Sequence, residues 1–391
     1  MKRILWLASW YPNRLAPLNA DFIQRHARAV SLYHEVDTIF VMRDATGKIT
    51  KGIKQEIIEE GQLTQHIIYY YSPKILIPVV DRLFSQLKYN RLFKKYIRQY
   101  IHEKGLPQLV HLHVGMKAGL LAMWLKRKYN TPYIVTEHWT GFLPEAADRF
   151  DGLSFYLQKK WKQLWTDAAG ISVVSVYLQE RLSALQANMP PLKIIPNVVD
   201  TTVFYPEEQE KRNITQFIHV SELGFQKNPE AILEAFAIVK ETNPSFQLTI
   251  FGPDNERGLS RIKELGLAEQ VRLHTEVPQQ ELAKYVRQSD ALILYSRYET
   301  FGCVVIEALA SGIPAIVSDI PVMHELIQDG KNGILVKPED PAALAEKILW
   351  FMRNQAAFDK TVIAGEAAAK YNYAITGKMF SEWYASFVTA S

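Results

Sequence analysis

The sequence predicts an α/β protein with two doubly wound, Rossmann-like domains in tandem. Its 391 residues exceed what a single hydrophobic core usually serves. Short apolar runs alternate with longer segments of helical periodicity, which is typical of parallel sheets covered by helices on both faces. A polar stretch at residues 206–213 interrupts this alternation and indicates a linker. Together these observations predict two domains facing each other across a cleft.

The first half of the chain carries the pattern of one such domain, residues 1–200. Amphipathic stretches such as 22–32, 83–101 and 155–165 separate its apolar runs. We expect strands at residues 3–9, 36–42, 67–71, 109–113, 133–136, 170–174 and 193–195. In parallel sheets ligands bind beyond the carboxyl ends of the strands, so the loops there are the expected location of the chemistry.

The alternation resumes after the linker and predicts a second domain, residues 201–372. We expect its strands at residues 216–220, 247–251, 271–274, 291–294, 315–317 and 333–336. Each is followed by a segment of helical character, as in the first half. The active site is therefore expected in the cleft between the two domains.

Composition narrows the class of protein. The chain is 48% hydrophobic and 22% charged, as is ordinary for a folded globular protein. The one cysteine, Cys303, excludes an internal disulfide framework and suits a reducing compartment. No apolar run approaches the ~18 residues of a membrane span. The short apolar run at residues 4–8 lacks a nearby cleavage site and is interpreted as a buried strand. We predict a cytoplasmic protein.

Charge is distributed unevenly along the chain. The net charge of +4 is too small to indicate a nucleic-acid partner, and none is predicted. Basic residues concentrate between residues 74 and 104, where eight lysines and arginines meet two acidic residues. Segment 83–101 interleaves these cations with apolar residues as an amphipathic basic helix. Such a helix can rest on an anionic membrane surface, or its apolar face can belong to the domain core; both alternatives stay open.

Residues 299–307 have the character of a phosphate-binding junction. They follow an apolar strand and open an apolar helix. Gly302 has no Cβ and lets the backbone approach a ligand closely. The amides of Gly302, Cys303 and Val304 would form a helix N-terminus, which attracts phosphate through unpaired N–H groups and the helix dipole.

Two glutamates flank this junction. Glu299 lies on the loop before the helix and can reach a sugar hydroxyl, whereas Glu307 can accept hydrogen bonds from both hydroxyls of a ribose. Two carboxylates at this spacing also occur by chance, so a capping glutamate and a solvated one form the structural alternative. The Phe-Gly pair between them and the turn at residues 311–314 into another strand favour a binding site.

The stretch 296–317, which contains this junction, resembles the signature of the group 1 family of retaining glycosyltransferases with the GT-B fold. That family shows a Glu, seven residues and a second Glu, followed by Ala-Leu-Ala-x-Gly-x-Pro, and this chain has the pattern intact. Residues 196–200 resemble the hinge motif Pro-Asn-Gly-Val-Asp, with Val198 in place of glycine. Residues 332–336 resemble its Asn-Gly-Leu-Leu-Val strand. The resemblance implies that residues 373–391 form a helix that returns to the first domain.

The resemblance further implies a nucleotide-sugar donor, UDP-activated more than GDP-activated. Lys227 matches the basic residue that neutralises the donor diphosphate, and its structural alternative is a solvated lysine at a helix start. Where the family usually has an arginine five residues earlier, this chain has Glu222. The donor-binding residues implied are Asn197, Gly252, Lys227, Glu299, Thr300, Phe301, Gly302, Cys303, Val304 and Glu307.

His138 matches the family's histidine near the reacting sugar. A lone histidine is more often structural, but its position at a strand end favours function. His111 and His113 are weaker candidates, for which a core role is at least as plausible. We find no Asp-x-Asp-like metal clamp, and the resemblance implies a fold that works without metal. We predict no metal site and no cofactor, because the nucleotide-sugar is itself a substrate.

The implied catalytic set is His138, Lys227 and Glu299. No carboxylate stands out as a covalent nucleophile, so a same-face displacement with retention is the expectation. The expected acceptor is a glycan or a lipid-linked molecule in cell-envelope polysaccharide or glycoconjugate synthesis, at the inner face of the cytoplasmic membrane. Two alternatives stay open: a catalytically silent nucleotide-sugar-binding protein, which Glu222 favours, and another GT-B enzyme such as a sugar-nucleotide epimerase.

Overall fold

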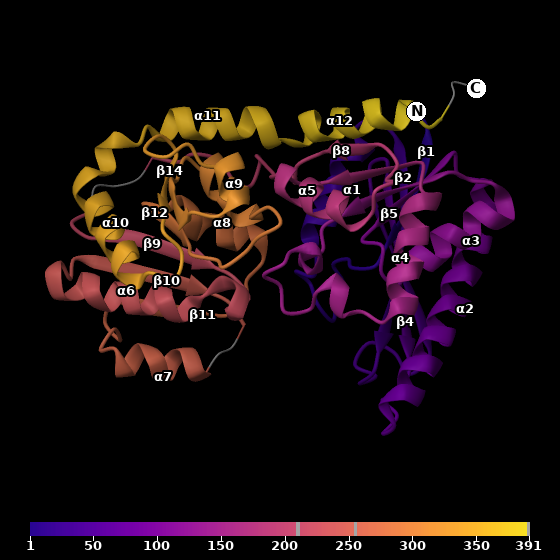
Figure 1. Cartoon of the computed structure of the whole chain (residues 1–391), viewed down its shortest axis with the longest axis horizontal. Coiled ribbons are helices and arrows are strands. Elements are labelled where there is room, and N and C mark those ends of the chain that lie inside the picture. Colours follow the sequence, from indigo (N-terminus) through magenta and orange to yellow (C-terminus); the bar gives the residue numbers. More distant parts are fainter. Residues whose placement is uncertain (209–211, 254–255, 389–391) are drawn as a thin grey trace.

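The computed structural model describes residues 1–208, 212–253 and 256–388 and contains two parallel sheets, each in its own domain (Figure 1). Part of the expected linker, residues 209–211, lies outside the described residues. The last strand of the first sheet ends at Ile194 and the first strand of the second begins at Thr215. The predicted fold class, two Rossmann-like α/β domains, is confirmed.

The N-terminal sheet has the order β3-β4-β2-β1-β5-β6-β7-β8. Its described strand pairs are parallel except β3–β4, which is antiparallel. The strands are β1 (Arg3–Ala8), β2 (Glu35–Asp44), β3 (Ile53–Glu60), β4 (Leu63–Tyr71), β5 (Leu109–His113), β6 (Tyr133–Glu137), β7 (Gly170–Val173) and β8 (Leu192–Ile194). The helices of this half are α1 (Asp21–Ser31), α2 (Pro78–Lys104), α3 (Gly119–Tyr129), α4 (Phe155–Asp167) and α5 (Val176–Leu185).

Alternation along β1 divides the helices between the two faces of this sheet. Leu5 and Leu7 belong to the core that also contains the buried residues of α2, α3 and α4. Ile4 and Trp6 point to the opposite face and pack with buried residues of α1 and of the last helix of the chain. Successive side chains of a strand point to opposite faces, so an almost wholly apolar strand can bury residues on both.

The C-terminal sheet has the order β11-β10-β9-β12-β13-β14 with parallel pairing throughout the described strands. Its strands are β9 (Thr215–Val220), β10 (Phe246–Phe251), β11 (Val271–His274), β12 (Ala291–Leu294), β13 (Ala315–Ser318) and β14 (Gly333–Val336). Its helices are α6 (Pro229–Thr242), α7 (Glu256–Glu264), α8 (Gln279–Arg287), α9 (Cys303–Ala310), α10 (Pro341–Asn354) and α11 (Lys360–Tyr371). Short 3₁₀ helices are η1 (Thr140–Phe142), η2 (Phe150–Gly152), η3 (Phe225–Lys227), η4 (Pro321–Glu325) and η5 (Gln355–Ala357).

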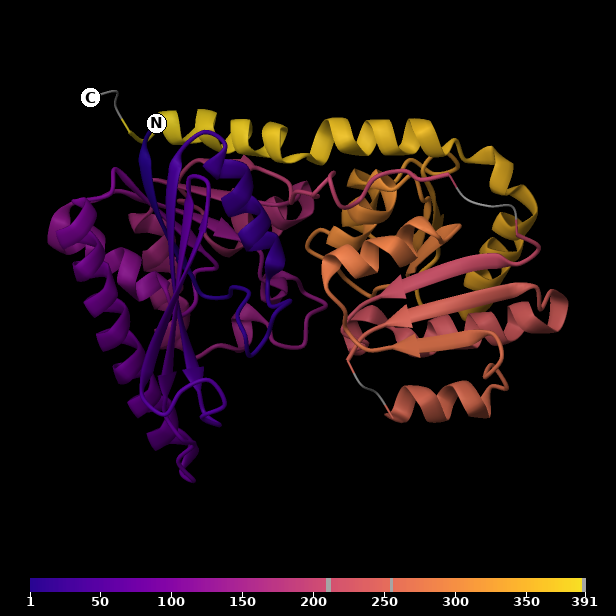
Figure 2. The same cartoon turned by 180° about the vertical axis from the view of Figure 1, so that it is seen from behind.

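The last helix, α12 (Tyr373–Ala385), continues the line of α11 from the C-terminal domain to the N-terminal one (Figures 1 and 2). It packs along α1, and Phe380 and Tyr384 are fully buried in the core on that face of the first sheet. The Tyr384 hydroxyl and Nδ1 of His111 form a hydrogen bond of 2.6 Å. This buried contact anchors α12 on the first domain.

Two elements of the N-terminal domain differ from the sequence expectation. Strand β3 is missing from the predicted strands because its sequence is rich in charge and its side chains are largely exposed. It pairs antiparallel with β4 at the edge of the sheet, where charged residues protect an open edge from pairing with another chain. Helix α2 begins at Pro78 rather than near residue 83, and its N-terminal end projects beyond the rest of the domain (Figures 1 and 2).

Among the residues that the structure describes, none of the helices combines the length and the apolar character needed to cross a membrane.

Candidate active site

A cavity of about 770 Å³ lies between the two domains. Its wall combines the loops after β1 and β6 of the first domain with those after β9, β10 and β12 of the second. These are carboxyl ends of parallel strands, where such folds bind their ligands. The predicted site residues on its wall are His138, Asn197, Lys227, Gly252, Glu299, Thr300, Phe301, Gly302, Cys303 and Val304.

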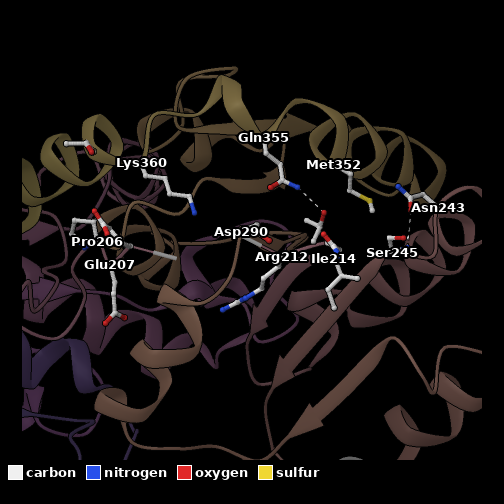
Figure 3. Close-up of a pocket in the computed structure, with 14 residues that line it drawn as sticks. Pro206, Glu207, Arg212, Ile214, Asn243, Ser245, Asp290, Met352, Gln355 and Lys360 are labelled. Carbon is white, nitrogen blue, oxygen red and sulfur yellow. Dashed lines mark hydrogen bonds between the residues drawn. The ribbon is translucent and has the colours of Figure 1, made fainter. Parts of the chain in front are cut away.

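A second pocket, of about 950 Å³, lies at the opposite edge of the C-terminal sheet (Figure 3). Its wall includes Thr215, where β9 begins, together with Ser245 and Asp290, which directly precede β10 and β12. Gln355 donates a hydrogen bond of 2.9 Å to the Thr215 hydroxyl. Because the pocket lies at the amino ends of the strands, the interdomain cavity is the candidate active site.

The loop between β12 and α9 forms one wall of the cavity. Gly302 has a φ of 96°, the left-handed conformation that favours glycine, and α9 begins directly after it at Cys303. A Cβ on Gly302 would also lie 3.0 Å from Cε of Met323. The Ser175 hydroxyl of the first domain donates a 2.8 Å hydrogen bond to the carbonyl of Thr300. The loop is therefore held from both domains, with the N-terminus of α9 directed at the cavity.

Lys227 and Glu299 form an ion pair at the cavity wall. Lys227 ends the short helix η3, and Glu299 is 5% exposed. The Ser296 hydroxyl donates a 2.9 Å hydrogen bond to the Glu299 carboxylate, and the Gln226 amide donates a second one of 3.3 Å. Lys227 and Glu299, which are both predicted to bind the nucleotide-sugar, thus bind each other in this conformation. The hydrogen bonds from Ser296 and Gln226 further orient the Glu299 carboxylate.

Glu307 is engaged by the other domain. Nη1 of Arg25, on α1, donates to its carboxylate at 2.7 Å, and the two side chains are 2% and 5% exposed. Burial raises the pKa of Glu307 to about 7, although Arg25 acts in the opposite direction. Burial also disfavours the charged form of Arg25, but Asp21 and Glu307 outweigh it and hold its pKa above the ordinary value. In contrast to the solvated alternative, Glu307 is a buried partner in a contact between domains.

Glu307 does not belong to the described wall of the cavity, which ends at Val304 on this helix. Asp21 lies 3.5 Å from Nη2 of Arg25 and also accepts a hydrogen bond from the Gln279 amide at the start of α8. The predicted contact of Glu307 with a ribose remains a prediction, and in this arrangement of the domains Arg25 occupies the carboxylate. Arg25 and Asp21 carry no motif that marks them in the sequence.

His138 stands on the cavity wall and is 5% exposed. Its ring packs against Phe22 at 4.7 Å between centroids, and neither ring nitrogen has a hydrogen-bond partner among the described residues. Burial lowers the pKa of His138 well below its ordinary value, so the ring is neutral near pH 7. His111 behaves differently, because both of its ring nitrogens are bonded at 2.6 Å, to Tyr384 and Thr136.

The remaining predicted residues also surround the cavity. Asn197 is 3% exposed and its Oδ1 has no partner among the described residues. A Cβ on Gly252 would lie 2.6 Å from the Leu223 side chain, so close packing against the loop after β9 requires glycine there. Burial raises the pKa of the Cys303 thiol to about 12, which excludes a thiolate nucleophile near neutral pH. Glu222, in the place of the family's arginine, is exposed on the same wall.

Comparison with known proteins finds two family models that match the chain in tandem. Residues 203–371 match the family model "Glycosyl transferases group 1", and residues 59–203 match "Glycosyltransferase Family 4". The chain is 25% identical over 321 residues to a phosphatidyl-myo-inositol mannosyltransferase of Mycobacterium leprae, covering 78% of this chain and 80% of the relative. It is 29% identical over 377 residues to a D-inositol 3-phosphate glycosyltransferase of Corynebacterium urealyticum, covering 88% and 86%.

Solved structures show the same fold. A sucrose-phosphate synthase from Thermosynechococcus elongatus superposes with a TM-score of 0.77 at 19% identity, covering 99% of each chain. Anabaena HepE, solved in complex with UDP and glucose, superposes with a TM-score of 0.71 at 16% identity, covering 99% of this chain and 100% of that one. By its two family matches and its two-domain fold, the chain belongs to the group 1 glycosyltransferases with the GT-B fold.

Proposed function

We propose that this glycosyltransferase moves a sugar from a nucleotide-sugar donor, with retention, to a glycan or lipid-linked acceptor in cell-envelope polysaccharide or glycoconjugate synthesis. The observation that carries the proposal is the interdomain cavity, which is lined by the N-terminus of α9 and the Lys227–Glu299 pair from the second domain and by His138 from the first. UDP is preferred to GDP because a protein of the same fold, Anabaena HepE, has been solved with UDP-glucose.

In the proposed donor complex, the diphosphate lies at the N-terminus of α9. Lys227 exchanges its ion pair with Glu299 for the phosphate oxygens, and the helix amides share in their charge. Glu299, released from Lys227, accepts a hydrogen bond from a sugar hydroxyl. These groups supply the counter-charge, so the proposed reaction uses no metal at the diphosphate and no cofactor.

The transfer step breaks the bond between the anomeric carbon and the diphosphate and forms a bond to the acceptor oxygen on the same face. The departing phosphate oxygen accepts the acceptor's proton. His138, which is neutral and comes from the first domain, contacts the donor sugar or braces the acceptor. Identification of the anomer in the product tests this mechanism, and an inverted product would contradict it.

Glu222 favours one alternative, a nucleotide-sugar-binding protein without activity. Its exposed carboxylate lines the cavity where a cation is usual in the family, and it would repel a diphosphate. Release of free UDP or GDP from the sugar conjugate in the presence of an acceptor distinguishes the enzyme from the binder. We expect release, because Lys227 and the start of α9 remain in place.

UDP or GDP is expected to raise the melting temperature of the protein, while ADP does not. A ligand that binds the folded state at 100 times its Kd adds about 2.7 kcal/mol of stability. A thermal-shift screen of the three nucleotides and their sugar conjugates measures this. The matched variant Glu307→Gln is expected to lose the shift while keeping a carbonyl to face Arg25. Equal shifts with all three nucleotides, or none, would contradict the proposed donor site.

The structure divides the predicted basic helix into a part that packs on the core and a part that is exposed. The second half of the predicted segment packs on the domain core, through Leu92, Phe93, Ile97 and Tyr100. The apolar surface lies at the projecting start of α2 instead, and we call it the apolar tip. The apolar tip consists of the exposed residues Ile75, Leu76, Ile77, Val79, Leu83, Phe84 and Leu87. Exposed cations surround it, at Lys74, Arg82, Lys88 and Arg91. We propose that it docks on an anionic membrane surface.

In a density gradient, the protein is expected to float with anionic liposomes and to remain at the bottom when only neutral liposomes are present. Changing Leu83 and Phe84 to serine removes apolar contact and is expected to abolish flotation, which high salt should also weaken. The matched control changes two exposed apolar residues of the other domain, Ile238 and Val362, to serine and is expected to float normally. Flotation that survives the changes in the apolar tip would contradict membrane docking there.

A further inference from the structure

Three histidines that are far apart in the sequence meet beside the cavity. His26 lies on α1, His113 ends β5, and His138 follows β6. One ring nitrogen of each lies within 4.8 Å of the corresponding nitrogens of the other two. His26 and His113 are fully buried, and His138 is 5% exposed. The cluster lies outside the phosphate-binding wall and has no role in the proposed transfer apart from the contact of His138 with the substrates.

The spacing of the three rings matches the coordination of a single ion. Their centroids are 5.7 Å, 5.8 Å and 6.1 Å apart. Imidazoles bound to one zinc ion through bonds of about 2.1 Å have centroids roughly 5 to 6 Å apart. The nitrogens that bind one zinc ion lie roughly 3.3 Å from one another. The three histidine nitrogens lie within 4.8 Å of one another here, and small rotations of the rings about their side-chain bonds bring them to that distance.

The ring nitrogens are available to an ion. Five of the six, Nδ1 of His26 and both nitrogens of His113 and His138, have no hydrogen-bond partner among the described residues. Buried polar atoms are rarely left in this state without a ligand or water to satisfy them. Burial lowers the pKa of all three histidines, which keeps the rings in the neutral form that ligates metal.

The surroundings orient the rings as they do in metal sites. Nε2–H of His26 donates to the carbonyl of Pro196 at 3.1 Å, which leaves the lone pair of Nδ1 for an ion. Trp6 stacks on His113 with centroids 4.0 Å apart, and Phe22 packs on His138. The supporting elements are a helix and the ends of two neighbouring strands, which are rigid.

We propose that His26, His113 and His138 bind one divalent transition-metal ion of the zinc class. Imidazole nitrogen is a preferred ligand of zinc, cobalt, nickel and copper, and a three-histidine site leaves a position for water or an anion. His138 is part of the cavity wall, so that position is reached from the cavity. The ion would tie α1 to the sheet and immobilise the His138 ring. This inference goes beyond the proposed transfer, which uses no metal at the diphosphate.

The test uses the full chain, freed of any histidine tag and of metal by chelation. We expect it to bind one equivalent of Co²⁺ with the visible absorption of four-coordinate cobalt, and one equivalent of Zn²⁺ by calorimetry. The variants His26→Gln, His113→Gln and His138→Gln are expected to bind at least about 100-fold more weakly. The control His274→Gln removes a partly exposed histidine of the C-terminal domain and is expected to bind normally.

A second measurement does not depend on the folding of variants. X-ray absorption of the zinc-loaded wild-type protein is expected to show three imidazole ligands at about 2.0 Å. Absence of a stoichiometric site, a first shell without imidazoles, or equal loss in the His274 control would overturn the proposal. Metal binding is expected to persist in Lys227→Met, so failure of the transfer proposal and failure of this one are distinguishable.

Discussion

Replacing Lys227 by methionine is expected to lower kcat/KM for sugar transfer by about 100- to 1,000-fold, the usual loss when one group that stabilises a developing negative charge is removed. The lysine stands at the cavity wall in an ion pair with Glu299. Methionine has a similar length but no charge, so it leaves the departing diphosphate with the amides of α9 alone. Steady-state kinetics with a radiolabelled donor measure the effect.

The division of this loss between kcat and KM identifies what the lysine does. A cation that acts on the leaving phosphate lowers kcat, whereas one that only holds the donor raises KM. Lys227→Arg keeps the charge and should recover part of the activity. Lys284→Met, which changes an exposed lysine on α8, is the matched control and should be unaffected. Activity of Lys227→Met within about threefold of wild type would favour the alternative of a lysine that merely begins a helix.

Replacing Arg25 by methionine is expected to destabilise the present arrangement of the two domains by up to about 3 to 5 kcal/mol. The substitution leaves the carboxylate of Glu307 buried without a charged partner. Because Arg25 and Glu307 belong to different domains, separation of the domains relieves this cost at a pH where Glu307 is charged, since it lets water reach the carboxylate. Small-angle scattering is expected to report a larger radius of gyration for the variant, and thermal unfolding a lower midpoint.

The effect of Arg25→Met is expected to depend on pH. Arg25 lowers the pKa of Glu307, which burial raises, so its removal raises that pKa further. A carboxyl whose pKa is raised in the folded state keeps its proton to a higher pH when the protein is folded than when it is unfolded. Its contribution to stability is fully present below the ordinary pKa of 4.5 and is lost as the pH rises from there through the raised pKa. The variant should therefore resemble wild type near pH 5 and differ most near pH 8.

A double variant separates charge from packing. Arg25→Met with Glu307→Met replaces the ion pair by two apolar side chains of similar length, and such replacements of buried pairs are often neutral. It is expected to restore the compact scattering profile, although not donor binding. If Arg25→Met alone scatters and melts like wild type at pH 8, the pair does not hold the domains together. The contacts from Ser175 to Thr300 and from Glu325 to the first amides of α5 would then suffice.

Much of the fold was predictable because its determinants are local. A strand buried on both faces, such as β1, must be apolar along almost its whole length, and that run is visible in the sequence. Strand β3 was missed because its sequence has no such apolar run. It lies at a sheet edge with charged, exposed side chains, so its stability comes from pairing with β4 rather than from its own pattern. The start of α2 was placed too late because its first residues are exposed and lack amphipathic periodicity.

The geometry of the junction between β12 and α9 was also predictable, because its parts are contiguous. The glycine that must adopt a positive φ, the helix that starts after it and Glu299 on the loop before it all lie within a few residues. The predicted role of Lys227 at the donor diphosphate rested only on the family resemblance. Its ion pair with Glu299 joins residues that lie 72 positions apart, on loops after two neighbouring strands, β9 and β12.

The sequence by itself therefore determined the fold class and the local geometry of the junction between β12 and α9, since periodicity and turn chemistry act over short stretches of chain. Only the tertiary structure decided what Glu307 touches, because its partner Arg25 lies 282 residues earlier and in the other domain. The same holds for the histidine cluster. His113 and His138 come from neighbouring strand ends, and His26 joins them only because α1 packs across that face of the sheet. Contacts of this kind depend on strand order and on how the domains meet, and no local pattern encodes them.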